Sequence, residues 1–390
     1  TAPFQETGDD ATVKPPEDHN FSAKSWPEGW ANIDPMKSYA QVFDGTLSAS
    51  GNPELIFTRG SNQPNEGIDQ MVIHQLPRSA TGWNTHGLTQ KLVDAYYMND
   101  GTDVPGKDKE IGRGNGSNRS TGYVTQDDYN AKKYRPLRAG ASLQYANREP
   151  RFYASVAYSG SFWTLLNETK EENRNKQVFY YSADPKGNGF NSANGYWLRT
   201  GFGVKKFVHP SDTYEGGVGS RVVPKAEPAI RYADILLMYA EALNELSGSF
   251  TIPSWRGGSY TLSRDIAEIK KGIQPVRIRA GVPDYPESVY GSKNELRRTI
   301  KRERFIELMG EGQRYYDLRR WMDAPVEEAL PVYGCNVLMN EKERDLFYQP
   351  VAIWTLKTTF ADKMWFWPIS HTELKRNKNL TQNPGWTYND

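Results

Sequence analysis

The sequence is poor in cysteine and carries almost no net charge. Cys335 is the single cysteine among the 390 residues, which excludes an internal disulfide bond and a zinc site built from four thiolates. The 48 Lys and Arg residues nearly balance the 47 Asp and Glu residues. This balance gives no electrostatic reason to expect nucleic acid or an anionic membrane surface as a partner. No apolar run approaches the roughly 20 residues that a membrane-spanning helix needs.

Catalytic and metal-binding motifs are scarce as well. The five histidines are scattered, and no two have the i, i+4 spacing with which a helix offers two zinc ligands. No G-x-S-x-G turn marks a serine nucleophile, and no local pattern marks the carboxylate pair that glycoside hydrolysis requires. We therefore predict no catalytic residue, no metal ion and no cofactor.

Aromatic residues, in contrast, are abundant. The chain has 11 Trp, 23 Tyr and 15 Phe, which make up 13% of its residues, and many of the Trp and Tyr residues stand beside Gly, Asn or Ser. Such neighbourhoods are typical of sugar-binding surfaces, where a flat ring stacks on the C–H face of a pyranose. They are equally typical of loops that an aromatic side chain anchors to a core. Both interpretations stay open for each ring.

Short elements are expected in the first half of the chain. The pattern predicts a strand over 55–57 and a helix that Thr89 caps. Residues 148–163 alternate well enough to predict a strand, and this strand would end at a Ser-Gly-Ser turn that presents Trp163. Long polar segments separate these elements.

Helical patterns dominate from Pro228 onward. Pro228 suits the first position of a helix whose apolar residues recur at helical spacing as far as Leu246. A short helix is expected over 264–272, and a longer one that begins at a Ser292 cap and reaches at least Met309.

Small residues are expected to interrupt one of these helices and to allow others to pack closely. Gly310 and Gly312 would interrupt or bend the helix that Ser292 begins, before the segment 313–321. The alternating Ala, Leu and Tyr residues of 229–246 are of the kind found in tetratricopeptide helices, where small side chains allow close helix–helix contact. Residues 364–374 resemble a strand that leads into a turn.

Three glutamates form an acidic stripe at i, i+4 and i+8, namely Glu303, Glu307 and Glu311. Such a stripe suits a metal site or acid–base chemistry. A structural ion network is favoured, because arginines surround the stripe in the sequence and pairing with arginine neutralises it. The arginines expected in this network are Arg302, Arg304, Arg314, Arg319 and Arg320.

Four groups of segments resemble the SusD/RagB family, the surface-exposed outer-membrane lipoproteins with which Bacteroidetes capture nutrients. They occur in order along the chain: LTQKLVDAYYMNDG (88–101); REPRFYASVAYSGSFW (148–163); AIRYADILLMYAEALNE (229–245) with VRIRAG (276–281); and ERFIELMGEGQRYYDLRRW (303–321) with WPISHTELKRNKNLTQNPGW (367–386). The resemblance implies a mainly α fold, a tetratricopeptide-like helical scaffold with large irregular loops and a few short strands.

The resemblance also implies a function. Members of this family capture an oligosaccharide or polysaccharide, sometimes a peptide, at the cell surface and deliver it to a SusC-like, TonB-dependent outer-membrane transporter. They are not enzymes and need no cofactor. They lie on the extracellular face of the outer membrane and are held there through a lipidated N-terminal cysteine that this chain does not contain, so contact with the membrane is expected only through that anchor.

The resemblance further predicts how the chain is organised. In the family, the segment matched by 88–101 lies well inside the protein, after several helices. We therefore expect this chain, 1–390, to be the C-terminal portion of one SusD-like domain. Within it, residues 1–227 would form a loop-rich part that faces the ligand, and residues 228–390 the helical scaffold and C-terminal tail.

Candidate ligand-binding residues are aromatic side chains at turns, with one amide. Trp163 is the first candidate because it ends the expected strand at a turn, and Tyr158 lies on the same strand. Trp83 with Asn84, before the Thr89 helix, and Trp255, in the excursion after the Pro228 helix, are further candidates. Aromatic residues within the family motifs are expected in the core instead, namely Trp321, Trp365, Trp367 and Trp386. Capture of peptides by the same scaffold and hydrolysis of glycans stay open as alternatives.

Overall fold

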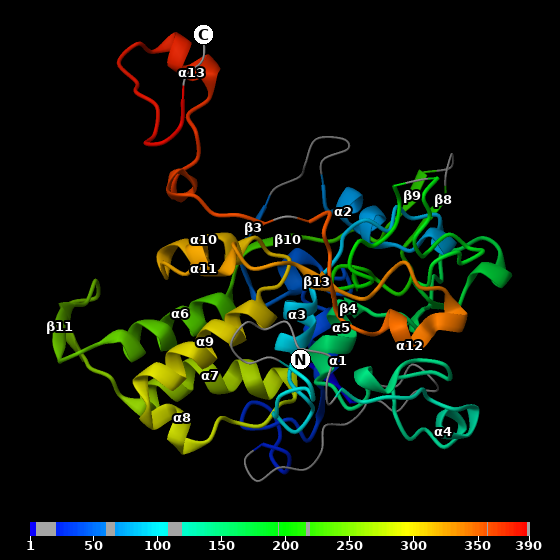
Figure 1. Cartoon of the computed structure of the whole chain (residues 1–390). Coiled ribbons are helices and arrows are strands. Elements are labelled where there is room, and N and C mark those ends of the chain that lie inside the picture. Colours follow the sequence, from blue (N-terminus) through cyan, green and yellow to red (C-terminus); the bar gives the residue numbers. More distant parts are fainter. Residues whose placement is uncertain are drawn as a thin grey trace.

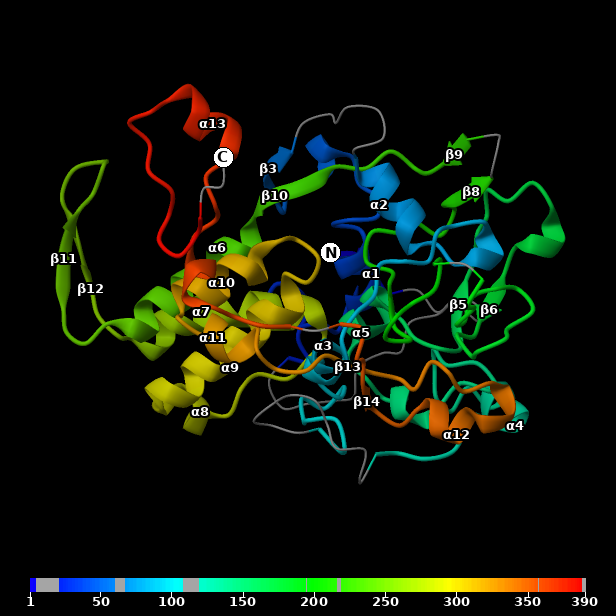
Figure 2. The ribbon, with the colours of Figure 1, turned by 45° about the horizontal axis from the view of Figure 1, so that its top comes forward.

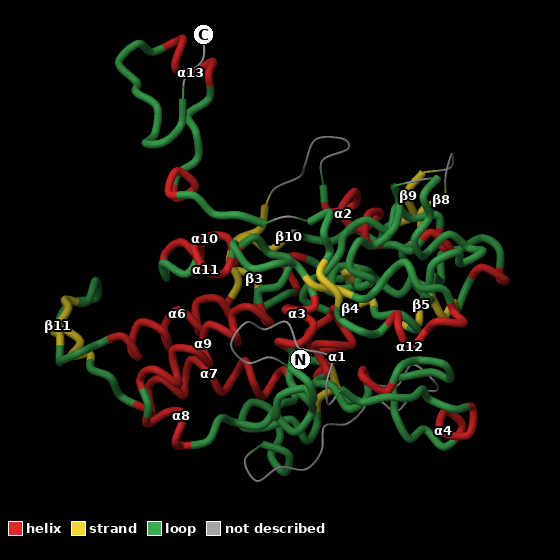
Figure 3. Tube along the Cα trace, in the orientation of Figure 1, coloured by secondary structure: helices red, strands yellow, loops and turns green. Residues whose placement is uncertain are grey.

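The protein consists of a helical scaffold joined to a loop-rich part (Figure 1). The computed structural model describes residues 1–4, 21–59, 67–107, 119–193, 195–215, 219–356 and 358–387. The scaffold contains α6 (Tyr232–Glu245), α7 (Ile266–Ala280), α8 (Glu287–Gly291), α9 (Lys293–Glu307), α10 (Gln313–Arg320) and α11 (Ala324–Glu327). Loops make up most of the remainder (Figure 3).

Shorter elements punctuate the loops. The remaining helices are α1 (Pro35–Ala40), α2 (Ile68–Gln75), α3 (Gln90–Ala95), α4 (Gln126–Asn130), α5 (Pro150–Ser155), α12 (Arg344–Phe347) and α13 (His371–Arg376). Every strand in the described ranges lies in an antiparallel pair: β1 (Ala2–Pro3) with β2 (Ile33–Asp34), β3 (Leu55–Arg59) with β10 (Glu227–Arg231), β4 (Val156–Ala157) with β7 (Gly203–Val204), β5 (Ser161–Trp163) with β6 (Lys176–Val178), β8 (Thr213–Glu215) with β9 (Gly219–Arg221), β11 (Phe250–Pro253) with β12 (Ser259–Leu262), and β13 (Tyr333–Gly334) with β14 (Val351–Ala352).

The predicted fold class is confirmed, and so are several local signals. The Thr89 hydroxyl accepts a hydrogen bond from the Leu92 N–H at 3.3 Å and so caps α3. The Ser292 hydroxyl accepts one from the Glu295 N–H at 3.3 Å and caps α9. Gly310 and Gly312 have φ angles of 78° and 80° and separate α9 from α10.

The strand predicted over 148–163 is wrong for most of its length. Residues 150–155 form helix α5, with Pro150 at its first position, and only short strands follow. Alternation predicts a strand when one face is buried and the other exposed. Here every residue from 150 to 161 is buried, so alternating side chains do not mark two different faces.

The boundaries of three helices in the scaffold also differ from expectation. Pro228 lies in strand β10, opposite Thr58 of β3, and helix α6 begins only at Tyr232. The short helix expected over 264–272 continues through Pro275 to Ala280 as α7. Helix α9 ends at Glu307, before Met309.

The C-terminal segment differs most. Residues 364–374 form no strand; a 3₁₀ turn at Asp362–Trp365 and helix α13 take its place. Trp367, expected in the core, is 70% exposed. In Figure 1 helix α13 stands apart from the scaffold helices, whereas Trp367 meets the Tyr315 ring of α10 edge-on at the surface, with ring centroids 5.9 Å apart. No helix in the described ranges has both the length and the apolar character needed to cross a membrane.

Helices α6 and α7 approach closely at a pair of small residues. A Cβ atom built on Gly272 would lie 2.5 Å from the Leu236 carbonyl oxygen and 2.9 Å from the Ala240 Cβ. Only glycine fits there without a shift of the helices. The expected use of small residues for close helix–helix contact therefore holds at this crossing.

The acidic stripe is buried in an ion network, as expected, with Glu303 and Glu307 on α9 and Glu311 in the turn after it. Glu303 accepts hydrogen bonds from Arg277 at 3.0 Å and from the Tyr285 hydroxyl at 2.6 Å. Arg151 of α5 bridges two carboxylates, since its Nη1 lies 2.6 Å from Glu303 Oε1 and 2.9 Å from Glu307 Oε2. The network thus joins α5, α7 and α9.

The same network continues toward β10. Arg231 donates to Glu307 at 2.7 Å and to Glu311 at 2.6 Å, Arg279 also binds Glu307, and Lys206 donates to Glu311 at 2.6 Å. Burial by itself raises the pKa of Glu307, but the three arginines around it hold that pKa well below its ordinary value. The carboxylate stays ionised inside the protein.

The arginines expected to neutralise the stripe pair elsewhere. Arg304 binds Asp317 and Asp234, with Nε 2.8 Å from Asp317 Oδ2. The others bind carboxylates outside α9: Arg302 with Asp103, Arg314 with Glu327, Arg319 with Glu328, and Arg320 with Glu241. The predicted network is confirmed, whereas its predicted cations are wrong, because the cations come from distant parts of the chain.

The α6–α7 crossing predicts how two glycine substitutions differ. Gly272→Ala should destabilise the protein by about 1–3 kcal/mol, because the added methyl forces the helices apart. Gly291→Ala is the matched control, since a Cβ at Gly291 meets nothing within 4 Å. It should be neutral or slightly stabilising. Denaturant unfolding followed by circular dichroism measures both, and equal midpoints for the two variants would contradict the close contact.

The ion network makes a second prediction. Glu307→Gln should cost about 3–5 kcal/mol of unfolding free energy, because it leaves buried arginines without their counter-charge. Glu295→Gln removes an exposed carboxylate of the same helix and should change the unfolding free energy by less than about 1 kcal/mol. The same denaturant assay applies, and a loss at Glu307 no larger than that at Glu295 would show that the network is not structural.

Candidate functional site

The structure places Trp163 and Tyr158 inside the core. Trp163 on β5 is 2% exposed. Tyr158 stacks on Phe152 with ring centroids 5.7 Å apart and lies 4.8 Å from the Tyr145 ring. No face of either ring is open to a ligand here, because both rings pack against other side chains. Ligand contact by these two residues stays an untested prediction, and their observed contacts are those of packing residues.

Asn84 has a local structural role. Its side chain is buried, its φ angle is 52°, and its Nδ2 donates a hydrogen bond to the Asn188 carbonyl at 2.8 Å. This bond ties the turn after Trp83 to a loop about a hundred residues later in the chain. Asn84 therefore fixes the backbone that carries Trp83.

Trp83 belongs to a group of surface side chains, termed here the Trp83 cluster: His74, Arg78, Trp83, His86 and Tyr196. The Trp83 and Tyr196 ring centroids are 6.3 Å apart, with planes inclined at 46°. Trp83 is half-buried and Tyr196 is 44% exposed. The Arg78 guanidinium lies 5.2 Å from the centre of the Tyr196 ring. Two inclined rings and a cation thus share one patch.

Backbone hydrogen bonds hold the cluster in place. The segment after α2 folds back along it: the Trp83 N–H donates to the Ile73 carbonyl at 2.9 Å, and the Thr85 N–H donates to the His74 carbonyl at 2.9 Å. This return requires glycine at position 82, because a Cβ there would lie 2.3 Å from the Leu76 carbonyl oxygen. The cluster therefore lies on a fixed turn.

One imidazole contacts the Trp83 ring and stacks on a second imidazole. The His74 ring meets Trp83 edge-on, with centroids 4.5 Å apart, and stacks on His86 at 4.8 Å. Burial lowers the pKa of His74, and burial with the neighbouring His74 lowers the pKa of His86. Both rings are therefore uncharged at neutral pH, and Arg78 carries the charge of the cluster.

Sequence reasoning found Trp83 but missed Tyr196, Arg78 and the histidine pair. Tyr196 follows Gly195, which is the neighbourhood typical of sugar-binding aromatics, so a signal was present. Nothing in the sequence shows that it meets Trp83.

Trp255 lies elsewhere. It is 86% exposed in the turn of the β11–β12 hairpin, with the Arg256 guanidinium 4.6 Å from a ring centre. Figure 2 shows this hairpin projecting from the scaffold on the side away from α2. The structure does not bring Trp255 together with the Trp83 cluster. Across the described ranges, no group of three or more His, Cys, Asp or Glu residues could hold a metal ion.

Comparisons with known proteins identify the family. The model of the SusD family matches residues 53–386. A SusD-like protein P2 from Formosa agariphila is 32% identical over 160 residues, which are 40% of this chain and 25% of that protein.

Solved structures show the same fold. A SusD-like protein from Bacteroides fragilis has a TM-score of 0.62 at 24% identity, over 90% of this chain and 57% of that one. A second one from the same species, described as a SusD-like carbohydrate-binding protein, has a TM-score of 0.57 at 23% identity, over 88% of this chain and 57% of that one. The chain therefore spans little more than half the length of these structures.

The histidine pair predicts a pH dependence of stability. Because folding lowers the pKa of His86 below its ordinary value of 6.5, the unfolded chain takes up the proton first as the pH falls. Stability from this group is complete above pH 6.5 and declines below it. When the pH is lowered from 7.5 to 5.5, the melting temperature of His86→Gln should therefore fall less than that of the unsubstituted protein.

The control for this experiment is His371→Gln, an exposed position on α13, which should keep the pH dependence of the unsubstituted protein. Identical pH profiles for His86→Gln and the unsubstituted protein would contradict an uncharged histidine pair.

Proposed function

This chain belongs to the SusD family, and we propose that it binds an oligosaccharide at the Trp83 cluster. The observation that carries the proposal is the pair of neighbouring rings, Trp83 and Tyr196, inclined at 46° on one patch. Aromatic rings accept the C–H faces of sugars, and the Arg78 guanidinium and neighbouring backbone supply hydrogen bonds to hydroxyls. Two inclined rings suit successive sugars of a curved chain better than a flat ribbon.

Binding is favoured over hydrolysis by the state of the acidic residues. The three carboxylates of the acidic stripe, Glu303, Glu307 and Glu311, are buried and bound to arginine or lysine. A general acid must exchange a proton with a substrate that reaches it. These carboxylates form ion pairs within the scaffold and are not available to a substrate. Their pairing supports a protein that captures its ligand without cleaving it.

The short length of the strands favours an oligosaccharide over a peptide as the ligand. A peptide groove would offer a sheet edge for backbone pairing, but the described strands are two to five residues long. Short edges of this kind give a peptide few main-chain hydrogen bonds.

Delivery is the second part of the proposal. We place the protein on the extracellular face of the outer membrane, tethered through a lipid anchor, where it passes the glycan to a SusC-like, TonB-dependent transporter. Support comes from membership of the family. Co-purification from outer membranes with an epitope-tagged protein tests it, and recovery of the tagged protein without any TonB-dependent transporter would contradict it.

Affinity electrophoresis on a panel of polysaccharides tests ligand binding. The protein should be retarded by at least one glycan, and Trp83→Ala and Tyr196→Ala should each weaken that binding by about tenfold, the size expected for loss of one aromatic contact. Tyr316→Ala is the matched control, since Tyr316 is an exposed ring on scaffold helix α10.

A further variant, Trp255→Ala, decides whether the β11–β12 hairpin takes part in binding. Retardation lost only in Trp255→Ala would move the site to the hairpin. A protein that no glycan retards, or one that Trp83→Ala leaves fully retarded, would contradict the site proposed here, provided that the variants melt like the unsubstituted protein.

A further inference from the structure

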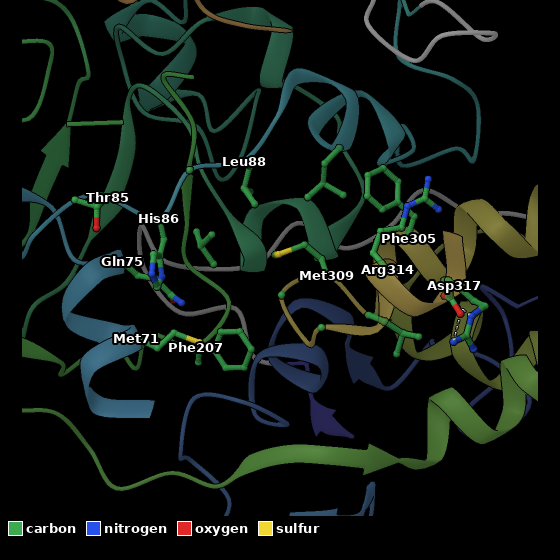
Figure 4. A pocket seen from close by; sticks show the side chains of 17 residues that line it. Met71, Gln75, Thr85, His86, Leu88, Phe207, Phe305, Met309, Arg314 and Asp317 are labelled. Atoms are coloured by element: carbon green, nitrogen blue, oxygen red, sulfur yellow. Dashed lines mark hydrogen bonds and ion pairs between the residues drawn. The ribbon is translucent and has the colours of Figure 1, made fainter. Parts of the chain in front are cut away.

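A pocket of about 450 Å³ lies where the loop-rich part meets the scaffold (Figure 4). Helix α2 forms one wall, residues 85–88 and α3 form another, and the end of α9 with the turn into α10 closes the opposite side. Its volume falls in the range that proteins use for small ligands. Most of its lining is apolar, from Met71, Leu88, Leu92, Phe207, Phe305 and Met309.

The charged groups at one end of this pocket are already neutralised. Arg304 and Asp317 form two hydrogen bonds with each other, at 2.8 and 3.0 Å. Arg314 donates to Glu327 at 3.0 Å. A charged ligand would therefore find no unpaired group of opposite charge among the described residues that line the pocket. Moving a charge from water into an apolar site without such a partner is unfavourable.

The other end of the pocket is polar but uncharged. His86 stacks on His74, and its lowered pKa keeps it neutral at pH 7. The Thr85 hydroxyl lies 2.5 Å from His74 Nδ1, within hydrogen-bond distance. Figure 4 shows Thr85, His86 and Gln75 grouped at this end, away from Arg314 and Asp317.

Gln75 differs from the other residues of this polar group because its side-chain oxygen has no hydrogen-bond partner in the described part of the chain. It is the last residue of α2, is 4% exposed and lines the pocket. Its Oε1 has no hydrogen-bond partner among the residues that the structure describes. Folded proteins seldom leave a buried amide oxygen unpaired, so this acceptor is a candidate for a ligand's donor.

We propose that the pocket binds an uncharged, largely apolar group with one N–H or O–H that donates to Gln75 Oε1. An unsubstituted sugar fits poorly, because apolar walls would leave most of its hydroxyls unpaired. The pocket is therefore a site distinct from the Trp83 cluster, although His86 belongs to both and Thr85 contacts His74 of the cluster. This inference does not depend on glycan binding at the cluster.

Indole and 1-methylindole are matched probes for this site, since only indole carries an N–H. Isothermal titration calorimetry with the full chain should show that indole binds and that 1-methylindole binds about fivefold more weakly, the effect of one hydrogen bond. Indole-3-acetate, which adds a negative charge, should bind more weakly than either. The comparison of the two neutral probes requires no variant to fold.

Two variants locate the site. Gln75→Met removes the acceptor at similar volume and should reduce indole to the affinity of 1-methylindole without changing the latter. Met71→Trp fills the pocket from α2 and should abolish binding of both probes. Equal affinities of the two probes, no binding of either, or indole binding that neither variant changes would each overturn the proposal.

The glycan site serves as an independent readout. Gln75→Met should keep the retardation of the unsubstituted protein in glycan gels, and Tyr196→Ala should keep its affinity for indole. Loss of indole binding in Tyr196→Ala would overturn the separation of the two sites. Failure of every glycan to bind, with indole binding intact, would contradict only the proposed glycan function.

Discussion

The burial of three carboxylates, Glu303 and Glu307 on α9 and Glu311 in the turn after it, is the constraint on which the remaining structure depends. Removing a carboxylate from water is costly unless cations and hydrogen bonds surround it. Glu307 meets this condition with Arg151 of α5, Arg231 of β10 and Arg279 of α7. The first two lie 156 and 76 residues away in the sequence. Pairing at Glu307 therefore requires the loop-rich part and the scaffold to come together.

This requirement explains where a ligand can be bound. The helices of the scaffold use their charged and small side chains on one another, in the ion network and at the crossing of Gly272 with Ala240. Exposed aromatic side chains also lie at turns. The Trp83 cluster is such a place, because its turn is held along α2 by backbone hydrogen bonds while the Tyr196 ring stays exposed.

Local signals in the sequence predicted the scaffold well and the site only in part. Caps such as Thr89 and Ser292 act within one helical turn, so they can be read from neighbouring residues. The cations of the network could not be read from neighbouring residues. Arg151 and Arg231 reach the stripe through tertiary contacts, whereas the arginines next to it in the sequence pair with other carboxylates. Trp163 was expected at a surface turn but is buried, since a turn in the sequence does not show what lies over it. The contact between Trp83 and Tyr196 likewise depends on the tertiary fold and could not be predicted from the local sequence.

Amide hydrogen exchange in the presence and absence of a bound glycan tests the central claim most directly, that a rigid ion-paired scaffold presents a ligand site on turns. The account predicts slower exchange in residues 81–88 and 195–199 when the glycan is bound. Exchange in α6, α7 and α9 should stay unchanged. Protection confined to those scaffold helices or to the β11–β12 hairpin, with none in residues 81–88, would contradict it.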